Sequence, residues 1–458
     1  MSETTDNAPA TQDPAQPARP YTFSVESPCN SGSTGNFLKA FQTILKHSNY
    51  AAVLDQYARM DMRCGRCADF CQIYLATKDP KDSPCYRTGL LLKVYKEYFM
   101  LDAGSKSVHK QGPLQDKDIH ELVESFYRCT TCKRCVQECP SGIDHALITH
   151  LGRYILSEMG ITPKPLQVSV RNQLEGSFKN IMNMSPPALE DTVEFLEEDL
   201  QEMTGQDIKI PIGKKGVDYI FYPPVSDFMS EAETLMGHAA AFHAMGLGDN
   251  WTISDQVYDS KNYGYYYSDW IFERIMKNLV DDAKRLGGKF IVIGECGHAT
   301  KASKIGVAAW HGKGAPHVLN SIEILYDAVK AGKIRFNPNA VPEKVTYHDP
   351  CNIGRNYGLF DEPRFILKQF CKNFVELKPN KAMNWCCGGG PSSMDDTKEF
   401  RMDVSGKLKA EQLNKSGADI VVSPCANCKK QISELIAHHG LNMQRSGLHD
   451  LVLKAIQW

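Results

Sequence analysis

The spacing of the cysteines constrains this chain more than any other feature. Sixteen cysteines occur among 458 residues, and most of them stand within three residues of another cysteine. Secreted proteins use dense cysteines as disulfides, but Cys-x-x-Cys groups in a chain without an export signal are typical of metal binding. The polar N-terminal stretch MSETTDNAPATQDPAQPARP lacks the apolar run of such a signal. We therefore expect the fold to be built around metal sites.

The sharpest of these groups is CTTCKRCVQECP, at residues 129–140. Its ligands would be Cys129, Cys132, Cys135 and Cys139. This C-x2-C-x2-C-x3-C-P run is typical of bacterial ferredoxins, in which three cysteines bind one [4Fe–4S] cluster and the fourth binds a neighbouring cluster. A structural zinc site is the alternative, because four thiolates also suit zinc. The three evenly spaced cysteines and the proline after the fourth favour iron–sulfur binding.

A second group lies upstream, in DMRCGRCADFC at residues 61–71. Its three cysteines match the last three of the ferredoxin run, and Asp61 stands in the place of the first. The nearest spare thiol is Cys85, in KDSPCYRTG. With the ligand exchange of two-cluster ferredoxins, the first cubane site would use Cys64, Cys67, Cys85 and Cys139, and the second would use Cys129, Cys132, Cys135 and Cys71. Asp61 or an open iron position remains the alternative to Cys85.

The segments around both groups have the periodicity of helices. Apolar residues recur every three or four positions in residues 35–61, 88–104 and 145–160, which predicts amphipathic helices. The N-terminal domain is therefore expected to be an α-helical ferredoxin rather than the small βαβ kind. After it, the acidic stretch SPPALEDTVEFLEEDLQEMTG also has a helical period. We interpret that stretch as a solvated spacer helix.

From about residue 215 the pattern changes to short β-rich runs followed by helical ones. VDYIFYP, KFIVIG, KVTYHDP and DIVVSP are four such runs, each ending in glycine or proline. Strands that alternate with helices predict a parallel sheet, and ligands of such sheets gather at the carboxyl ends of the strands. Three of the runs end within a few residues of a cysteine: Cys296, Cys351, and Cys425 with Cys428. These thiols are expected at one edge of the sheet.

A vicinal pair of cysteines, in NWCCGGGP at residues 384–391, supplies two more thiols that we expect at that edge of the sheet. The thiols expected there are Cys351, Cys386, Cys387, Cys425 and Cys428. Five thiolates are one more than a tetrahedral zinc or a regular cubane accepts, whereas two adjacent thiolates can reach two neighbouring irons. The glycines at 388–390, Gly388, Gly389 and Gly390, let the backbone approach a cluster and point N–H groups at its sulfurs. A redox-active dithiol or a zinc site is the alternative.

The combination of Cys351, the Cys386–Cys387–Gly388 motif and Cys425-x2-Cys428 resembles the CCG domain of the heterodisulfide reductase family. A two-cluster ferredoxin region ahead of a CCG domain is similar to the HdrD, GlpC and DsrK branches of that family. The segments HDPCNIGRNYGLFDEPR, CCGGGP and GECGHA are most similar to DsrK and to the HmcF and TmcB subunits of the transmembrane redox complexes of sulfate reducers. The resemblance implies that the five cysteines hold a noncubane [4Fe–4S] cluster at which disulfide or trisulfide chemistry occurs.

The chain also departs from that family. Heterodisulfide reductases carry two full CCG motifs, but the first half here keeps only Cys296. This implies one noncubane cluster beside the two cubane ones, with the first half as scaffold and pocket wall. Cys296 and His298 are then candidate substrate-side groups, in addition to Cys351, Cys386 and Cys387, and a structural role for either is an equal alternative.

The expected fold class is thus α+α/β, an α-helical ferredoxin domain followed by an HdrB-like CCG domain. The expected order is a disordered tail at 1–25, the ferredoxin domain at 26–165, a helical linker at 166–214, and the CCG domain at 215–458, with a degenerate half at 215–340 and a complete half at 341–458.

Three functions fit these expectations. The first is an oxidoreductase subunit that splits or forms a sulfur–sulfur bond in sulfate or sulfur respiration, the second a pure electron conduit, and the third the iron–sulfur subunit of a flavin-linked dehydrogenase. No Gly-x-Gly-x-x-Gly follows a strand, so a flavin would have to sit on a partner.

A net charge of −2 argues against nucleic acid as a partner. No apolar run reaches the length of a membrane span, so we expect a cytoplasmic chain attached to the membrane's inner face through a cytochrome b or quinone-type subunit. A small sulfur-carrying protein or a disulfide would be its substrate.

Overall fold

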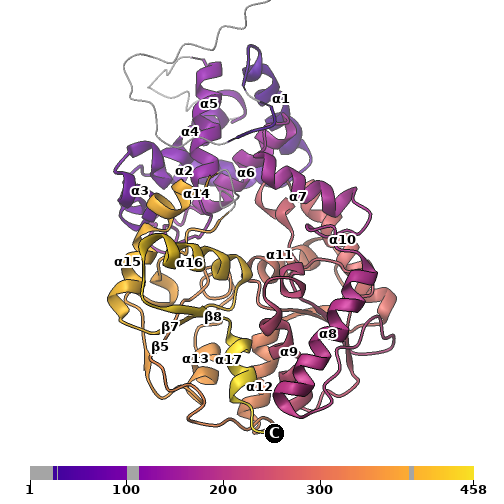
Figure 1. Cartoon of the computed structure of the whole chain (residues 1–458). Coiled ribbons are helices and arrows are strands. Elements are labelled where there is room, and N and C mark those ends of the chain that lie inside the picture. The colour runs from indigo at the N-terminus through magenta and orange to yellow at the C-terminus, as the bar shows by residue number, and fades with distance from the viewer. Residues whose placement is uncertain (1–23, 28, 101–112, 391–396) are drawn as a thin grey trace, which may run out of the picture.

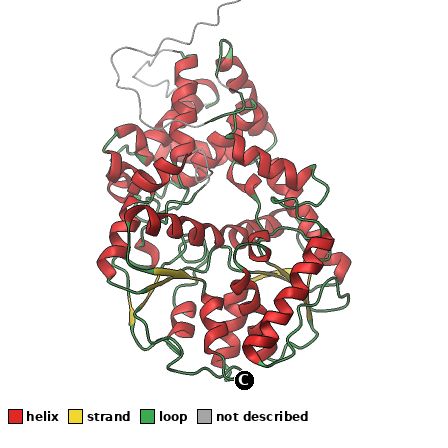
Figure 2. Cartoon of the chain, viewed as in Figure 1, coloured by secondary structure: helices red, strands yellow, loops and turns green. Residues whose placement is uncertain are grey.

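A computed structural model describes residues 24–27, 29–100, 113–390 and 397–458. Of the predicted N-terminal tail, only residues 24 and 25 fall within these ranges. An all-helical N-terminal part lies at the top of Figure 1, above a larger part that contains the strands. The strands form two separate sheets, one on each side of that larger part (Figure 2). This arrangement confirms the predicted α+α/β fold class.

The N-terminal part is a bundle of amphipathic helices joined by the cysteine-bearing loops. Its helices are α1 (Ser33–Lys46), α2 (Tyr50–Met60), α3 (Gln72–Thr77), α4 (Pro84–Tyr98), α5 (Asp116–Arg128), α6 (His145–Glu158) and α7 (Lys164–Leu174), with short 3-10 turns η1 (Arg66–Phe70) and η2 (Pro80–Asp82). Helix α1 buries Phe37, Phe41 and Ile44, which lie on one face because their spacing is three to four residues. These side chains belong to one core that also includes residues of α4, α5 and α6.

The C-terminal part contains two four-stranded parallel sheets with the same strand order. The first has the order β2-β1-β3-β4 and the second β6-β5-β7-β8. The strands are β1 (Tyr219–Tyr222), β2 (Trp251–Ile253), β3 (Phe290–Ile293), β4 (His317–Asn320), β5 (Val345–Tyr347), β6 (Phe374–Val375), β7 (Ile420–Val422) and β8 (Gln444–Ser446). The four runs expected from the sequence form β1, β3, β5 and β7, the central strands of the two sheets. The shared order shows that the two halves repeat one structural unit.

The repeat shows which positions of the first half lack a cysteine that the second half has. Cys296 is the third residue after β3 and Cys425 the third after β7, and each immediately precedes a helix, α11 (Gly297–Trp310) or α16 (Ala426–His439). Cys351 is the fourth residue after β5, and the matching position after β1 is Ser226. The position that matches Cys428 is Ala299. The first half therefore keeps the framework of the site and one of its thiols.

Helices cover both sheets. They are α8 (Pro186–Thr204), α9 (Ala232–Ala244), α10 (Asp269–Leu286), α12 (Ser321–Lys330), α13 (Glu362–Leu367), α14 (Lys398–Phe400), α15 (Lys407–Ser416) and α17 (Leu448–Ala455), with a 3-10 turn η5 (Tyr263–Tyr266) and a π-helical turn η8 (Arg401–Ser405). The interpretation of α8 as a solvated spacer is wrong. Its Leu189, Val193, Leu196 and Leu200 are buried in the core of the C-terminal part, because their spacing of four, three and four residues places them on one face beneath an acidic outer surface.

The carboxylate of Asp82 fastens the cysteine-bearing loops of the N-terminal part together. Arg128, the residue before Cys129, makes a bidentate ion pair with it, at 2.7 Å from Nε to Oδ1 and 2.9 Å from Nη2 to Oδ2. The two side chains are 2% and 0% exposed. The Asp82 carbonyl accepts a hydrogen bond from Arg87 Nη2 at 3.2 Å and lies 3.8 Å from the Cys71 Sγ. Breaking this ion pair would leave a buried charge without its partner.

We expect Asp82→Asn to lower the free energy of unfolding by about 3–5 kcal/mol, since it removes one charge of a buried ion pair. Chemical denaturation of the cluster-loaded protein, followed by circular dichroism, measures this. The control is Asp55→Asn, which removes the exposed ion pair with Arg59 and should cost less than about 1 kcal/mol. Equal effects of the two substitutions would show that the Asp82 pair does not hold the loops together.

Candidate redox site

One cavity gathers cysteines from both N-terminal groups. The thiols that line it are those of Cys71, Cys129, Cys132 and Cys135. The Thr131 N–H points at Cys129 Sγ, 3.3 Å away, and Thr131 and Lys133 have positive φ angles of 53° and 61°. These backbone turns curl the loop around the cavity. The structure therefore brings together the four thiols expected for the second cubane site, including the one from the upstream group.

A second group of thiols lies at the surface. Cys64 and Cys85 line a shallow cavity there, and Cys64 is exposed. The Cys67 thiol hydrogen-bonds to Cys85, which lowers the pKa of Cys85 to about 6. Ser83 Oγ lies 3.4 Å from the Cys85 Sγ. Cys85 thus lies beside Cys64 and Cys67, the two ligands that the upstream group is expected to supply to the first cubane site.

Cys139 and Asp61, the two remaining candidate ligands of this surface site, differ in their placement. An ion pair of 2.9 Å joins Arg66 Nη2 to Glu138 Oε2, and these two residues immediately precede Cys67 and Cys139. The ion pair ties the segment that bears Cys139 to the upstream group, although Cys139 itself is not among the described residues that line the surface cavity. Asp61, the alternative to Cys85, accepts a hydrogen bond from the Arg63 N–H at 3.1 Å, and its carboxylate is not among the described groups that line this cavity.

A third cavity, in the C-terminal part, collects the remaining predicted thiols. Its lining includes Cys351, Cys386, Cys387, Cys425 and Cys428. The Cys387 and Cys428 sulfurs are 3.2 Å apart, and the N–H groups of Gly388 and Gly389 point at Cys386 Sγ and Cys387 Sγ, each at 3.4 Å. All five are free thiols. Five thiols with N–H donors around them fit a multi-iron cluster better than one tetrahedral metal ion.

Two of the glycines are required by close packing. Gly388 has a φ of +91°, and a Cβ there would lie 2.7 Å from the backbone of Ser405, so a larger residue is excluded on both grounds. A Cβ on Gly390 would lie 2.7 Å from the Cα of Thr130. Gly390 therefore lets the loop of the five-cysteine cavity touch the loop that bears Cys129 and Cys132.

The thiols of the cavity around Cys129 and of the five-cysteine cavity are in direct contact. Cys132 hydrogen-bonds to Cys386, and this contact lowers the pKa of Cys132 and raises that of Cys386. Two arginines fix it from both sides. Arg355 donates to the carbonyls of Cys132 at 2.8 Å and of Ala382 at 2.7 Å, and Arg134 donates to the carbonyl of Met383 at 2.8 Å. The second cubane site and the five-cysteine site are thus joined without an intervening side chain.

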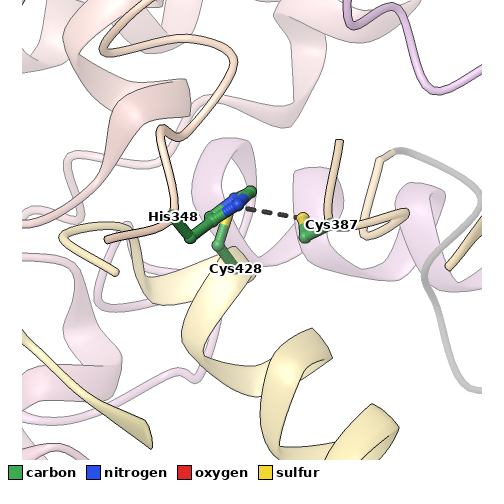
Figure 3. A group of neighbouring side chains, drawn as sticks. All are labelled: His348, Cys387 and Cys428. Carbon is green, nitrogen blue, oxygen red and sulfur yellow. Dashed lines mark hydrogen bonds between the residues drawn. The ribbon is translucent and has the colours of Figure 1, made fainter. Parts of the chain in front are cut away.

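A buried histidine approaches the five-cysteine site. Figure 3 shows the His348 imidazole hydrogen-bonded to Cys387, with Cys428 beside it. Burial lowers the pKa of His348. Its place one residue after β5 is a signal for the edge of the sheet at which the site lies. Lys409, which the sequence did not single out, is also fully buried there and donates to Asn384 Oδ1 at 2.8 Å.

Cys296 and His298, the two candidate substrate-side groups, differ in their access to the cavity. His298 lines it together with Tyr266, and the two rings stack at 4.3 Å. Its Nε2 lies 2.7 Å from the Asn262 carbonyl, its buried Nδ1 has no hydrogen-bond partner among the described residues, and burial lowers its pKa to about 3. It is therefore a neutral imidazole with a free acceptor nitrogen. Cys296 is fully buried, with the Ala299 N–H 3.5 Å from its sulfur, and is not among the lining residues.

Comparison with known proteins supports the two-part site. A 4Fe-4S dicluster domain model matches residues 62–143, and a cysteine-rich (CCG) domain model matches residues 345–433. The chain is 27% identical to an Hdr-like menaquinol oxidoreductase iron-sulfur subunit 2 of Archaeoglobus fulgidus, over 92% of this chain and 83% of the relative.

Two further relatives are more distant. The chain is 24% identical to the HdrD component of the dihydromethanophenazine:CoB–CoM heterodisulfide reductase of Methanosarcina barkeri, over 81% of this chain and 88% of the relative. It is 22% identical to an EtfAB:quinone oxidoreductase of Syntrophomonas wolfei, over 81% of this chain and 54% of the relative. The chain therefore carries a 4Fe-4S dicluster domain and a CCG domain, and over most of its length it is similar to HdrD-like CCG-domain iron–sulfur subunits.

Proposed function

We propose that this chain is an iron–sulfur subunit of a membrane-bound redox complex and that its five-cysteine site makes or breaks sulfur–sulfur bonds. The reaction is RS–SR + 2 e⁻ + 2 H⁺ ⇌ 2 RSH, with electrons exchanged one at a time with a partner subunit. The observation that carries the proposal is the contact between Cys132 and Cys386. It joins a site suited to single-electron transfer to the site whose five thiols suit a multi-iron cluster. The resemblance to the DsrK branch supports a role of this reaction in sulfate or sulfur respiration.

Two cubane [4Fe–4S] clusters and one noncubane [4Fe–4S] cluster fit the three groups of thiols. The first cubane would be held by Cys64, Cys67, Cys85 and Cys139, the second by Cys71, Cys129, Cys132 and Cys135, and the noncubane by Cys351, Cys386, Cys387, Cys425 and Cys428. A noncubane cluster bound at the five-cysteine site supplies electron storage and Lewis-acidic iron for sulfur. The protein's contribution is to bring these thiols together, surround them with N–H donors and exclude water.

His298 is a side chain placed to orient a substrate thiol. Its Nε2–H donates to the Asn262 carbonyl, so the Nδ1 lone pair can accept a hydrogen bond from an S–H group. The low pKa of the ring keeps it neutral at pH 7. In the oxidative direction the imidazole is too weak a base to keep the thiol proton, which would leave to solvent as the sulfur–sulfur bond forms. Tyr266 holds the ring by stacking on it.

We expect Cys85→Ala and Cys139→Ala each to remove about four of about twelve irons per chain, because each would lose a ligand of the same surface cubane. Iron and acid-labile sulfide analysis of anaerobically purified protein, with EPR of the reduced clusters, measures this. Both substitutions should spare the signal of the cubane held by Cys129, Cys132 and Cys135. If Cys85→Ala changes neither iron content nor EPR, the ligand is another group, and zinc or at most eight irons in fully loaded protein contradicts the three-cluster assignment.

We expect the cluster-loaded protein to reduce a small disulfide with reduced methyl viologen as electron donor. Cys386→Ser should abolish this turnover, since it removes a thiol that contacts both sites. The matched control is Cys371→Ser, a buried cysteine (3% exposed) outside the three groups of thiols, which should keep full activity. Thiol formation and viologen oxidation are followed together so that the two-electron balance can be checked.

A pure electron conduit is the second candidate, and the relatives named as menaquinol oxidoreductase and quinone oxidoreductase proteins favour it. The same assay separates the two functions. A conduit would be reduced by viologen and pass electrons to a soluble acceptor, but would leave disulfides intact. That outcome would contradict sulfur–sulfur chemistry while leaving the ligand assignments in place.

We further propose that the N-terminal part docks on the inner face of the cytoplasmic membrane through a cytochrome b or quinone-type subunit. In the ranges the structure covers, no helix is both long and apolar enough to span a membrane. Cys64 is exposed, so a cubane held there would lie within reach of an outside donor. The five-cysteine site would then face a small sulfur-carrying protein or a free disulfide.

We expect the chain to migrate with a haem- or quinone-bearing integral membrane subunit after native membranes are extracted in mild detergent. Native electrophoresis with an antibody against the chain, followed by identification of the comigrating subunits, tests this. A salt wash serves as control, because a merely adsorbed chain would be removed by it. A free monomer that is fully active with a soluble donor alone would contradict membrane docking.

A further inference from the structure

Two histidines and an aspartate meet on the surface of the C-terminal part. They are Asp403, in the π-helical turn η8, and His438 and His439, the last two residues of α16. One oxygen of Asp403 and one ring nitrogen of each histidine all lie within 4.8 Å of one another. Cys428 lies at the opposite end of α16, about 16 Å of helix away. The cluster is therefore separate from the three groups of thiols.

The hydrogen bonds of these side chains already orient them toward a shared centre. The Nε2 of His438 lies 2.9 Å from Oδ1 of Asp403, and the two side chains are 40% and 44% exposed. The Nε2 of His439 lies 3.2 Å from the Met402 carbonyl. Because a carbonyl can only accept a hydrogen bond, this Nε2 carries the hydrogen and leaves Nδ1 with a lone pair. Histidines that bind metals commonly donate their other ring N–H to a carbonyl in this way.

The charge around the cluster favours a cation. Both histidines stand in the last turn of α16, where the aligned peptide dipoles place partial negative charge, and the Asp403 carboxylate adds a full one. Among the described residues, Asp403 forms its only ion pair with His438. Two imidazoles and one carboxylate are a donor set that suits zinc, with water in the fourth position. A zinc ion would displace the proton that lies between Asp403 and His438.

The turn η8 connects this cluster to the five-cysteine site. Its last residue, Ser405, donates from Oγ to the Gly388 carbonyl at 3.0 Å, directly after the vicinal cysteines. Its first residue, Arg401, forms an ion pair with Glu434 of α16. Turns of the π type are rare and are found frequently at functional sites. A metal ion on Asp403 would hold the middle of η8 to α16, as Arg401 holds its beginning.

We propose that Asp403, His438 and His439 form a zinc site that fastens η8 to the carboxyl end of α16. Zinc has no redox chemistry of its own, so the ion would take no part in electron transfer. Its effect is to restrain the turn that supports the Gly388 loop of the five-cysteine site. This proposal does not depend on the sulfur–sulfur chemistry proposed above, because it concerns a separate set of ligands.

Zinc binding by the cluster-loaded protein is measured by equilibrium dialysis, with elemental analysis of zinc and iron. The wild type should bind about one zinc per chain at this site without losing iron. Asp403→Asn and His438→Ala should each weaken zinc binding about tenfold or more, since the loss of even a supporting group costs that much at a metal site. The control is His317→Ala, which removes an exposed histidine of β4 outside the cluster and should leave the affinity unchanged. Manganese should bind more weakly than zinc.

Hydrogen exchange of the backbone amides tests the fastening of η8. Zinc should slow exchange in residues 401–405 of the wild type and leave it unchanged in His438→Ala. Equal zinc affinity in the wild type and in the variants of the cluster, no zinc bound, or zinc taken up only as iron is lost would overturn the site. Zinc bound at full affinity with no slower exchange in residues 401–405 would overturn the fastening of the turn.

Discussion

The whole site depends on bringing together thiols from segments far apart in the sequence. Several thiols in one cavity repel as they ionise, so they need fixed positive charge and fixed backbone around them. Buried and half-buried arginines provide both. Arg153 donates to the carbonyls of Phe126 and Cys129, Arg128 pairs with Asp82, and Arg355 holds the Cys132 loop. Charged donors bonded to carbonyls fix loop geometry more firmly than neutral ones.

Much of this architecture could be read from the sequence. The central strands were found because they are apolar runs ending in glycine or proline, and the cysteine groups because their spacing is specific to metal binding. The edge strands were missed because they are short and partly polar, as in Gln444–Ser446 and Phe374–Val375. Edge strands pair on one side only, so they need fewer apolar residues and leave a weaker signal.

The features that the sequence did not predict depend on tertiary contacts alone. Nothing local distinguishes Lys409 from the other lysines of a helix, and only its burial beside the five-cysteine site makes it notable. The same holds for Arg134 and Arg355, whose partners are backbone carbonyls far away in the sequence. For α8, the acidic composition obscured a buried stripe. The role of His348 could have been favoured, since it follows a strand at the edge where Cys351 lies.

The exposure of Cys64 has a consequence for the order in which oxidation would damage the thiol sites of this protein. Oxidants reach exposed thiolates before buried ones, and the other sites lie deeper, with Cys386 and Cys387 each 3% exposed. Damage would therefore begin at the outermost site and disconnect the inner ones from their electron supply while they are still whole. Under the proposed assignment, the surface cubane would be the first cluster lost to oxidation.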